Sequence, residues 1–155
     1  MSKSYIYPGA NSLNAYLTIK DCSKAIEFYK KAFDAKELGR LLVPNGLIGH
    51  AEIEIEGTML MIADENIDWG YKGPLTIGGN PITIGLYVKD VDSSFQKAID
   101  AGAKEVMPVK NEFYGDRVGQ VMDPFGYKWM IGTHIKDVSY EEMQQLSDQM
   151  FAPKE

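Results

Sequence analysis

The sequence predicts an α+β fold in which two tandem βαβββ modules form an open cup of mixed β-sheet with the helices outside. Three observations lead to this prediction. The length of 155 residues suits a single domain over 1–155, near the common domain size. One half of the sequence resembles the other when shifted onto it. The expected strands and helices repeat at the same shift, which is typical of a duplicated structural unit.

The internal repeat is visible in individual residues. The shift that superposes Leu17 on Leu86 also superposes Gly57 on Gly126, so the register holds across most of each half. The first-half members of the identical pairs are Leu17, Lys20, Asp21, Ala32, Gly57, Met61 and Ile62. Their second-half partners are Leu86, Lys89, Asp90, Ala101, Gly126, Met130 and Ile131. Because the expected secondary structure repeats together with the sequence, we expect both halves to fold alike.

The first module covers about 13–63. Apolar residues alternate with residues that carry a polar group over 13–19, which predicts a half-buried strand. A helix follows, because apolar residues recur at helical spacing after a capping residue, Asp21 or Ser23. Turn residues, such as those at 44–46, then separate three further strands. These strands are expected at 37–43, 48–55 and 59–63.

The second module covers about 82–133 and repeats this order. Its expected elements are a strand at 82–88, a helix near 93–101, and strands near 104–109, 118–122 and 128–132. The linker between the modules, 64–80, is rich in Gly, Asp and Asn, so we expect little regular structure there. A capping-box pattern from Ser139 to Glu142 predicts a final helix over about 140–151, outside the repeat.

The composition argues against several classes of function. Acidic side chains number 22 and basic ones 16, a net charge of −6. Because this charge repels a phosphate backbone, we expect no nucleic-acid partner. No apolar run approaches the roughly 20 residues that cross a bilayer, and the first residues lack a signal-peptide pattern. We therefore expect no membrane partner and a cytoplasmic location. The single cysteine, Cys22, agrees with a reducing compartment, and we assign it to packing.

Several segments carry a resemblance to a known superfamily. They are 17–21 with 25–29, 86–90 and, most specifically, the sequence Asp-Pro-Phe-Gly-Tyr-Lys-Trp at 123–129. Over roughly 13–134 the chain resembles the vicinal oxygen chelate superfamily, which includes glyoxalase I, extradiol dioxygenases and the bleomycin and fosfomycin resistance proteins. Within it, the segments 50–52, 87–92 and 115–117 look most like the PhnB-like branch. The resemblance implies paired βαβββ modules around a small-molecule pocket.

Metal enzymes of this superfamily hold their ion near the start of the first strand and on the last strand of each module. By the resemblance, the four equivalent positions here are Asn14, Met61, Thr83 and Met130. None is a good ligand for a catalytic divalent metal, because zinc, nickel and iron prefer imidazole, carboxylate or thiolate. We therefore predict no cofactor and no metal ligand at the usual site. The alternative is a divalent metal held by displaced ligands.

His50, Glu52 and Glu54 lie two residues apart on an expected strand, so their side chains share one face. If the opposite face packs on the helix, this face lines the cup. His50 and Glu52 are then candidate catalytic residues for proton transfer. The same side chains, with Asp64, are the candidates for displaced metal ligands. The alternative is that this face of the strand is simply exposed to solvent. The other histidine, His134, is expected to be an ordinary surface residue.

The same alternation predicts which side chains contact a ligand. The expected ligand-binding residues are Asn14, Tyr16, His50, Glu52, Met61, Thr83, Tyr87, Tyr114, Arg117 and Met130. Such a wall suits a small organic ligand, because Met adapts to irregular shapes while a few polar groups set orientation. The alternative is that the methionine and tyrosine side chains fill a closed core and contact no ligand. Arg117 would clamp an anionic or planar ligand or pair locally with Asp116, and Trp69 and Tyr71 are expected in a lid or a dimer contact.

Three functions of different classes are compatible with the sequence. The first is a metal-free small-molecule-binding protein, and the second is a metal-dependent lyase, isomerase or dioxygenase with displaced ligands. The third is a dimeric interaction module whose cup is vestigial. Whether the chain is an enzyme stays open at this point. The resemblance also implies a homodimer, because relatives of this fold usually pair.

Overall fold

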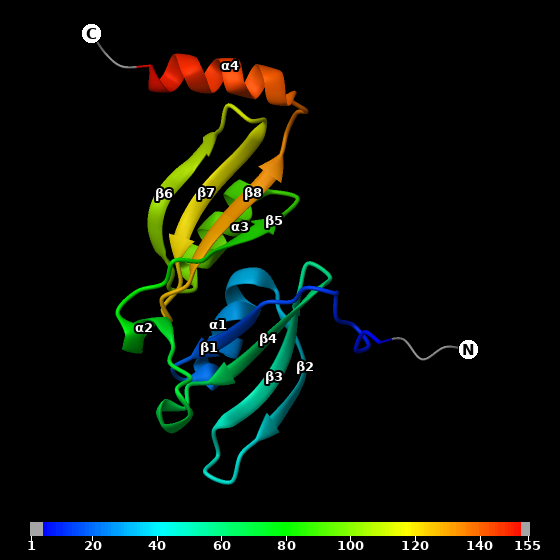
Figure 1. Ribbon diagram of the computed structural model, residues 1–155, viewed down its shortest axis with the longest axis vertical. Coiled ribbons are helices and arrows are strands. Elements are labelled where there is room, and N and C mark those ends of the chain that lie inside the picture. Colours follow the sequence, from blue (N-terminus) through cyan, green and yellow to red (C-terminus); the bar gives the residue numbers. More distant parts are fainter. Residues whose placement is uncertain (1–4, 153–155) are drawn as a thin grey trace.

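Two modules with the same order of elements build the protein, and the computed structural model describes residues 5–152 (Figure 1). The first module contains β1 (Tyr16–Ile19), α1 (Cys22–Phe33), β2 (Lys36–Leu42), β3 (Ile48–Ile55) and β4 (Thr58–Asp64). The second contains β5 (Thr83–Tyr87), α3 (Val91–Asp100), β6 (Lys104–Asn111), β7 (Asp116–Met122) and β8 (Lys128–His134). This arrangement confirms the predicted α+β class and the βαβββ repeat.

Each module has its own four-stranded sheet, and the two sheets have equivalent strand orders, β1-β4-β3-β2 and β5-β8-β7-β6. The first strand of each module runs parallel to the last, and the other neighbours are antiparallel. Within the part of the chain that the structure describes, no strand of one sheet pairs with a strand of the other. Each sheet therefore keeps one face covered by a helix and one open face.

The repeated Lys-Asp pair at the end of each first strand marks a helix cap. The Asp21 carboxylate accepts a hydrogen bond of 3.2 Å from the backbone N–H of Lys24, and Asp90 accepts one of 3.1 Å from Ser93. Such a bond satisfies one of the free N–H groups at the start of a helix. Of the two caps proposed for α1, Asp21 is the one used. The equivalent α3 begins at Val91, earlier than the predicted 93.

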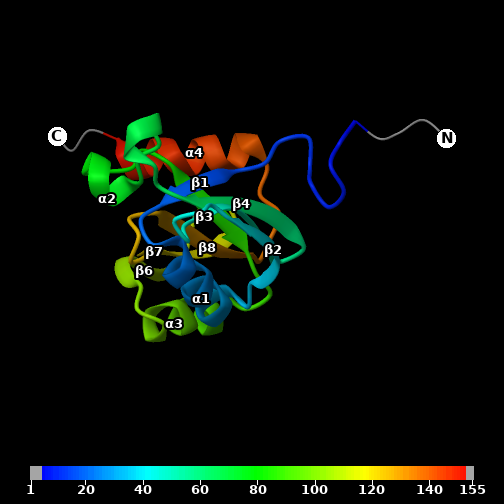
Figure 2. The same ribbon diagram turned by 90° about the horizontal axis from the view of Figure 1, so that it is seen from below.

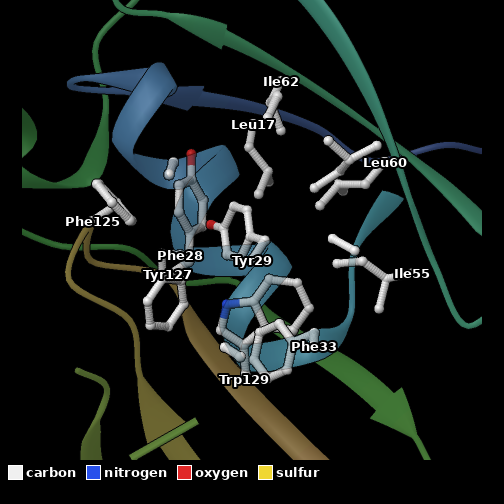
Figure 3. Close-up of a cluster of buried hydrophobic side chains, with 14 of the residues drawn as sticks. Leu17, Phe28, Tyr29, Phe33, Ile55, Leu60, Ile62, Phe125, Tyr127 and Trp129 are labelled. Atoms are coloured by element: carbon white, nitrogen blue, oxygen red, sulfur yellow. The ribbon is translucent and has the colours of Figure 1, made fainter. Parts of the chain in front are cut away.

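A hydrophobic core joins the two modules. One face of α1 is buried, as its apolar spacing predicts, and α1 packs against α3. The Trp129 ring on β8 lies 4.6 Å from the ring of Phe33 and 5.5 Å from that of Tyr29, measured between centroids (Figure 3). Trp129 is 2% exposed and Tyr29 0%. Because protein cores are close-packed, this contact fixes module two against the helix of module one.

The helices of the two modules, α1 and α3, and the open faces of the sheets lie on opposite sides of the molecule. Helices α1 and α3 lie together on one side (Figure 2), and the two sheets follow one another along the long axis (Figure 1). A final helix, α4 (Tyr140–Phe151), crosses the far end of module two. It begins where the Ser139 hydroxyl accepts a hydrogen bond of 3.1 Å from the Glu142 N–H. Within residues 5–152 no helix is both long and apolar enough to cross a membrane.

Two of the other differences from the predicted elements concern β1 and the linker. Strand β1 begins at Tyr16 rather than at 13, because the Asn14 side chain bonds to both the N–H and the carbonyl of Asn11 and so forms a turn. Asn side chains often compete with a strand ladder in this way. The linker, where little regular structure was expected, contains a 3₁₀ helix, η1 (Ile67–Trp69), and a short helix, α2 (Pro74–Ile77).

Candidate functional site

The strand register places the predicted side chains on the open face of module one. Tyr16 lies opposite Met61, and Met61 lies opposite Glu52, so these three residues form one row across the sheet. Their neighbours Leu17 and Ile62 point to the other face and are buried under α1. The alternation of side chains along a strand thus puts the expected ligand wall opposite the core.

A chain of hydrogen bonds crosses this open face through His50. The Tyr16 hydroxyl lies 2.9 Å from Nδ1 of His50, and Nε2 of His50 lies 3.3 Å from Oε1 of Glu52. Because a carboxylate only accepts, Nε2 carries a hydrogen, and Nδ1 is then free to accept from the Tyr16 hydroxyl. Burial raises the pKa of Tyr16 above its ordinary value. The predicted His50 and Glu52 are therefore brought together, with Tyr16 as a third member.

A hollow of about 720 Å³ opens beside this chain at the end of module one. Its walls come from the ends of β1 and β4, from the β2–β3 turn and from the linker. Tyr16, Trp69 and Tyr71 supply aromatic rings, while Asp64 and Glu65 supply carboxylates. We call this feature the module-one hollow. Trp69 and Tyr71, expected only in a lid or a dimer contact, are part of its lining.

Backbone hydrogen bonds hold both carboxylates of the module-one hollow. Asp64 accepts bonds of 2.7 Å from the N–H groups of Cys22 and Ile48. Glu65 accepts 3.0 Å from the Gly73 N–H and 2.7 Å from the Thr76 hydroxyl. Burial acts to raise the pKa of Glu65, but these two bonds, together with a smaller effect of the charge of Lys20, outweigh it and hold the pKa below its ordinary value. Both groups are therefore positioned by the fold rather than free to swing into solvent.

The loop that carries the aromatic rings is also hydrogen-bonded. The Asn66 side chain accepts a bond of 3.2 Å from the Trp69 N–H at the start of η1. Asn66 and Tyr71 then pair through their backbones as an antiparallel bridge. Sequence reasoning left this loop out of the site because it lies outside the repeat. Its cluster of exposed aromatic residues between two turn-rich segments is the signal that identifies it.

Module two carries a second hydrogen-bond chain on its open face. The Tyr87 hydroxyl donates 2.5 Å to Oδ2 of Asp116, and Nδ1 of His134 lies 2.7 Å from Oδ1 of the same carboxylate. Nε2 of His134 lies 2.9 Å from Asp137. The bonds to Asp116 and Asp137, the first being stronger, raise the pKa of His134 above its ordinary value. With a carboxylate at each nitrogen, the imidazolium form is the one that satisfies both bonds.

His134 lies at the surface, as the sequence indicated, but it is also bonded to two carboxylates. Strand β8 extends to His134, beyond the predicted end at 132, and pairs it with Asp116 across the sheet. Met130 lies on the same face as His134, since alternate residues share a face. Continuing that alternation past the expected strand end is the signal that would have found His134. Tyr87, Tyr114, Asp116 and His134 line a hollow of about 600 Å³, which α4 borders.

Arg117 does not point to this hollow. Its guanidinium makes two bonds of 2.7 Å to Asp92 at the start of α3 and one of 3.0 Å to Asn111. Because Arg117 follows Asp116 directly on β7, strand alternation turns it to the opposite face. The predicted clamp is thus corrected to an ion pair between the sheet and the helix, and it forms with Asp92 rather than with the adjacent Asp116.

The residues at the usual metal positions of the fold do not fit a divalent metal. Asn14 bonds to the backbone of Asn11, and Thr83 pairs with Lys128 on a different sheet. Met61 and Met130 offer thioethers, which suit copper(I) rather than zinc, nickel or iron. In the described range 5–152, no three His, Cys, Asp or Glu side chains gather as a metal-binding group. The expectation of a chain without a metal stays a prediction.

Comparison with known sequences identifies the family. The sequence model of the Glyoxalase/Bleomycin resistance protein/Dioxygenase superfamily matches residues 11–131. The chain belongs to this superfamily. Among its relatives, an uncharacterized protein of Mycobacterium bovis is 43% identical over 136 residues, which cover 86% of this chain and 90% of that protein. An uncharacterized protein of Arabidopsis thaliana is 31% identical over 127 residues, 76% of each.

Solved structures share the fold of this superfamily member. The Arabidopsis thaliana gene product matches with a TM-score of 0.64 and 28% identity, over 78% of this chain and 97% of that one. TioX from Micromonospora sp. ML1 matches with a TM-score of 0.64 and 24% identity, over 81% of this chain and 100% of that one. A PhnB protein from Bacillus cereus matches with a TM-score of 0.61 and 16% identity, over 79% of this chain and 99% of that one. This last likeness shows a shared fold.

Proposed function

We propose that the chain is a small-molecule-binding protein whose ligand occupies the module-one hollow without a metal. The observation that carries the proposal is the hollow itself, about 720 Å³ with exposed aromatic rings. Its size falls in the range of roughly 300 to 1,000 Å³ that ligand pockets occupy. Trp69 is 76% exposed and Tyr71 60%. Large rings exposed together on a hydrogen-bonded loop are typical of a binding surface.

The donor set at the usual metal positions supports the metal-free part of the proposal. A ligand held by metal coordination needs oxygen, imidazole or thiolate donors on the ion, whereas Met61 and Met130 offer thioether sulfur. The module-one hollow instead offers rings, hydroxyls and two fixed carboxylates. Recognition therefore rests on apolar contact, with a few polar groups setting the orientation.

Tryptophan fluorescence tests this proposal directly, because the two tryptophans differ in exposure. Trp129 is 2% exposed and serves as a constant background, whereas Trp69 lines the hollow. Protein freed of metal by dialysis against a chelator is screened with small organic molecules by thermal shift. We expect hits that raise the melting temperature and quench Trp69. In Trp69→Phe the quenching should vanish, and in Trp69→Ala affinity should fall.

A matched control separates the module-one hollow from the rest of the open face. Tyr87→Phe changes an aromatic residue of module two and should leave affinity unchanged. Hits that bind Trp69→Ala as tightly as the original chain would place the ligand elsewhere. If no compound raises the melting temperature while a partner protein does, the interaction-module alternative replaces this proposal.

The chain from Tyr16 through His50 to Glu52 favours a second candidate function, acid-base catalysis by a lyase or isomerase. A hydroxyl, a base and a carboxylate that orients the base are the usual parts of proton-transfer chemistry. In this case His50→Gln abolishes turnover of a bound compound but leaves its affinity within a few-fold. Equal loss of binding and turnover would make His50 a binding residue only.

We also propose a homodimer, for which the exposed apolar side chains of β2 are the support. Leu41 is 68% exposed and Leu42 62%. A partner would remove this apolar surface from water, which favours association. Sedimentation velocity at micromolar concentrations should give a dimer, and Leu41→Lys with Leu42→Lys should give a monomer. A monomer for the unchanged chain would overturn the proposal.

A further inference from the structure

We propose that the module-one hollow selects an organic cation, meaning a ligand with a quaternary or protonated ammonium group on an apolar body. The inference rests on the proposed binding function and names the class of ligand for that hollow. It follows from two features of the same wall. One is a set of exposed aromatic rings, and the other is a pair of fixed carboxylates that form no ion pair within the described residues.

Three aromatic residues surround the space in which a cation would lie. Tyr16, Trp69 and Tyr71 all line the hollow, and they are 53%, 76% and 60% exposed. The electron-rich face of an aromatic ring attracts a cation, and Trp does so most strongly. Several rings around one site form the kind of cage that recognises quaternary ammonium groups. Rings alone would also accept a neutral apolar ligand, so the preference for a cation depends on the charge of the wall.

The charge of the wall comes mainly from Glu65. Asp64 also lines the hollow, but its carboxylate turns toward the start of α1, where it accepts from the Cys22 N–H. No lysine, arginine or histidine is among the described residues that line the hollow. Within residues 5–152, neither carboxylate forms an ion pair. Their partners are backbone N–H groups and the Thr76 hydroxyl, which satisfy hydrogen bonds but leave the negative charge in place. The net charge of −6 adds an attractive field for a cation and repels an anion.

The geometry of Glu65 allows an isosteric test of this charge. Oε2 accepts both from Gly73 and from Thr76, while Oε1 contacts only the Thr76 hydroxyl, at 3.0 Å. In Glu65→Gln the amide oxygen can take the place of Oε2, and the amide NH₂ can donate to the Thr76 oxygen. The local structure is therefore retained while one negative charge is removed. Asp64→Asn is a poorer choice, because both of its oxygens accept from backbone N–H groups.

The experiment compares phenyltrimethylammonium with tert-butylbenzene, a neutral molecule of nearly the same shape. Binding to the full chain is followed through the indole N–H signals of Trp69 and Trp129 in nuclear magnetic resonance spectra. We expect the cation to bind at least about tenfold more tightly than its neutral isostere, and to shift the Trp69 signal but not that of Trp129. Raising the salt concentration should weaken the binding of the cation but not that of its neutral isostere, since salt screens charge.

Two variants assign the preference to the hollow. Glu65→Gln should reduce cation affinity several-fold and leave tert-butylbenzene unchanged. Glu54→Gln is the matched control: it removes the same charge from β3, at a residue that pairs with Lys36 outside the hollow. It should leave both affinities unchanged. If both variants lose the same cation affinity, the preference comes from the overall charge of the protein, and the proposed selectivity of this site is wrong.

The outcomes separate this inference from the proposed function. If tert-butylbenzene binds at Trp69 as tightly as the cation, the hollow still binds ligands but the cation inference is wrong. If neither probe shifts the Trp69 signal, the cation inference also falls. The proposed function fails only if, in addition, the compound screen yields no molecule whose binding depends on Trp69.

Discussion

The Tyr29 hydroxyl donates a buried hydrogen bond of 2.8 Å to Oδ2 of Asp123, which joins the helix of module one to the β7–β8 turn of module two. The same carboxylate accepts 3.0 Å from Nε1 of Trp129 and 2.9 Å from the N–H groups of Phe125 and Tyr127. Burial raises the pKa of Tyr29 well above its ordinary value and, despite these bonds, raises that of Asp123. The family-specific sequence at 123–129 is therefore structural.

Removing the Asp123 carboxylate should destabilise the whole fold. Asp123→Ala leaves the Tyr29 hydroxyl and the Trp129 N–H buried without acceptors, at a cost of about 1–3 kcal/mol each. We expect a loss of roughly 3 kcal/mol or more in the free energy of unfolding, measured by chemical denaturation. Tyr29→Phe removes one bond and one donor together and should cost about 1 kcal/mol.

The double variant provides the control for that prediction. In the Asp123→Ala background, Tyr29→Phe should be nearly neutral or favourable, because it removes a donor that has already lost its partner. Additive losses in the double variant would show that the two side chains act independently, contrary to the observed bond.

A pair of equivalent glycines separates backbone strain from packing. Gly57 and Gly126 occupy the same turn in the two modules, with φ of +73° and +89°. A Cβ at Gly57 meets nothing within 4 Å, whereas one at Gly126 would lie 2.7 Å from Cβ of Pro74 at the start of α2. Gly57→Ala should cost about 1–2 kcal/mol from its backbone conformation. Gly126→Ala should cost about 1–3 kcal/mol more.

Thermal and chemical unfolding of the two glycine variants give the comparison directly. A larger loss for Gly57→Ala than for Gly126→Ala would mean that α2 does not pack against the β7–β8 turn. Pro74→Gly, combined with Gly126→Ala, should recover part of the difference because it removes the clashing atom.

Cys22 should be unreactive while the chain is folded. It is 0% exposed, and burial, followed by the charge of Asp64, raises its pKa to about 12. At pH 8 only about one thiol in ten thousand is then the reactive thiolate. An aromatic disulfide reagent should label the native protein only as fast as it unfolds, and should label one thiol at once in denaturant. Rapid labelling of the native chain would contradict the packing role.

The bonds of His134 predict a pH dependence of stability. Asp116, and to a smaller degree Asp137, raise its folded pKa above the ordinary value of about 6.5. The imidazolium thus contributes stability that is complete below pH 6.5 and is lost as the pH rises through the higher folded pKa. The melting temperature of the unchanged chain minus that of His134→Gln should decline over this interval. A difference that stays constant between pH 6 and 9 would contradict the prediction.

Repeat and periodicity were sufficient to predict most of the fold. The strand predicted at 48–55 matches β3, because a turn bounds it on each side and its side chains alternate strictly from His50 onward. The boundaries that failed have local causes. At Asn14 a side chain competes for the backbone of the expected strand, and at Val91 the cap Asp90 starts α3 earlier than the apolar spacing alone indicates.

The site could be predicted only in part. Alternation correctly placed Tyr16 and Glu52 on one face, because it depends on strand geometry alone. The expected contact between Arg117 and a ligand was wrong. Asp116 faces the hollow of module two, and Arg117, the next residue on the strand, faces the other way. Trp69 was expected in a lid or a dimer contact and not among the ligand-binding residues, because its loop has no counterpart in the repeat.

The sequence by itself determined the two modules, their element order and the side of each strand that faces the core, because all three follow from short-range periodicity. The tertiary structure decided which elements meet. It alone brought Tyr29 to Asp123, placed Tyr16 and Trp69 around one hollow, and joined His134 to Asp116. These contacts lie far apart along the chain and depend on how the sheets, helices and linker pack, which local patterns do not encode.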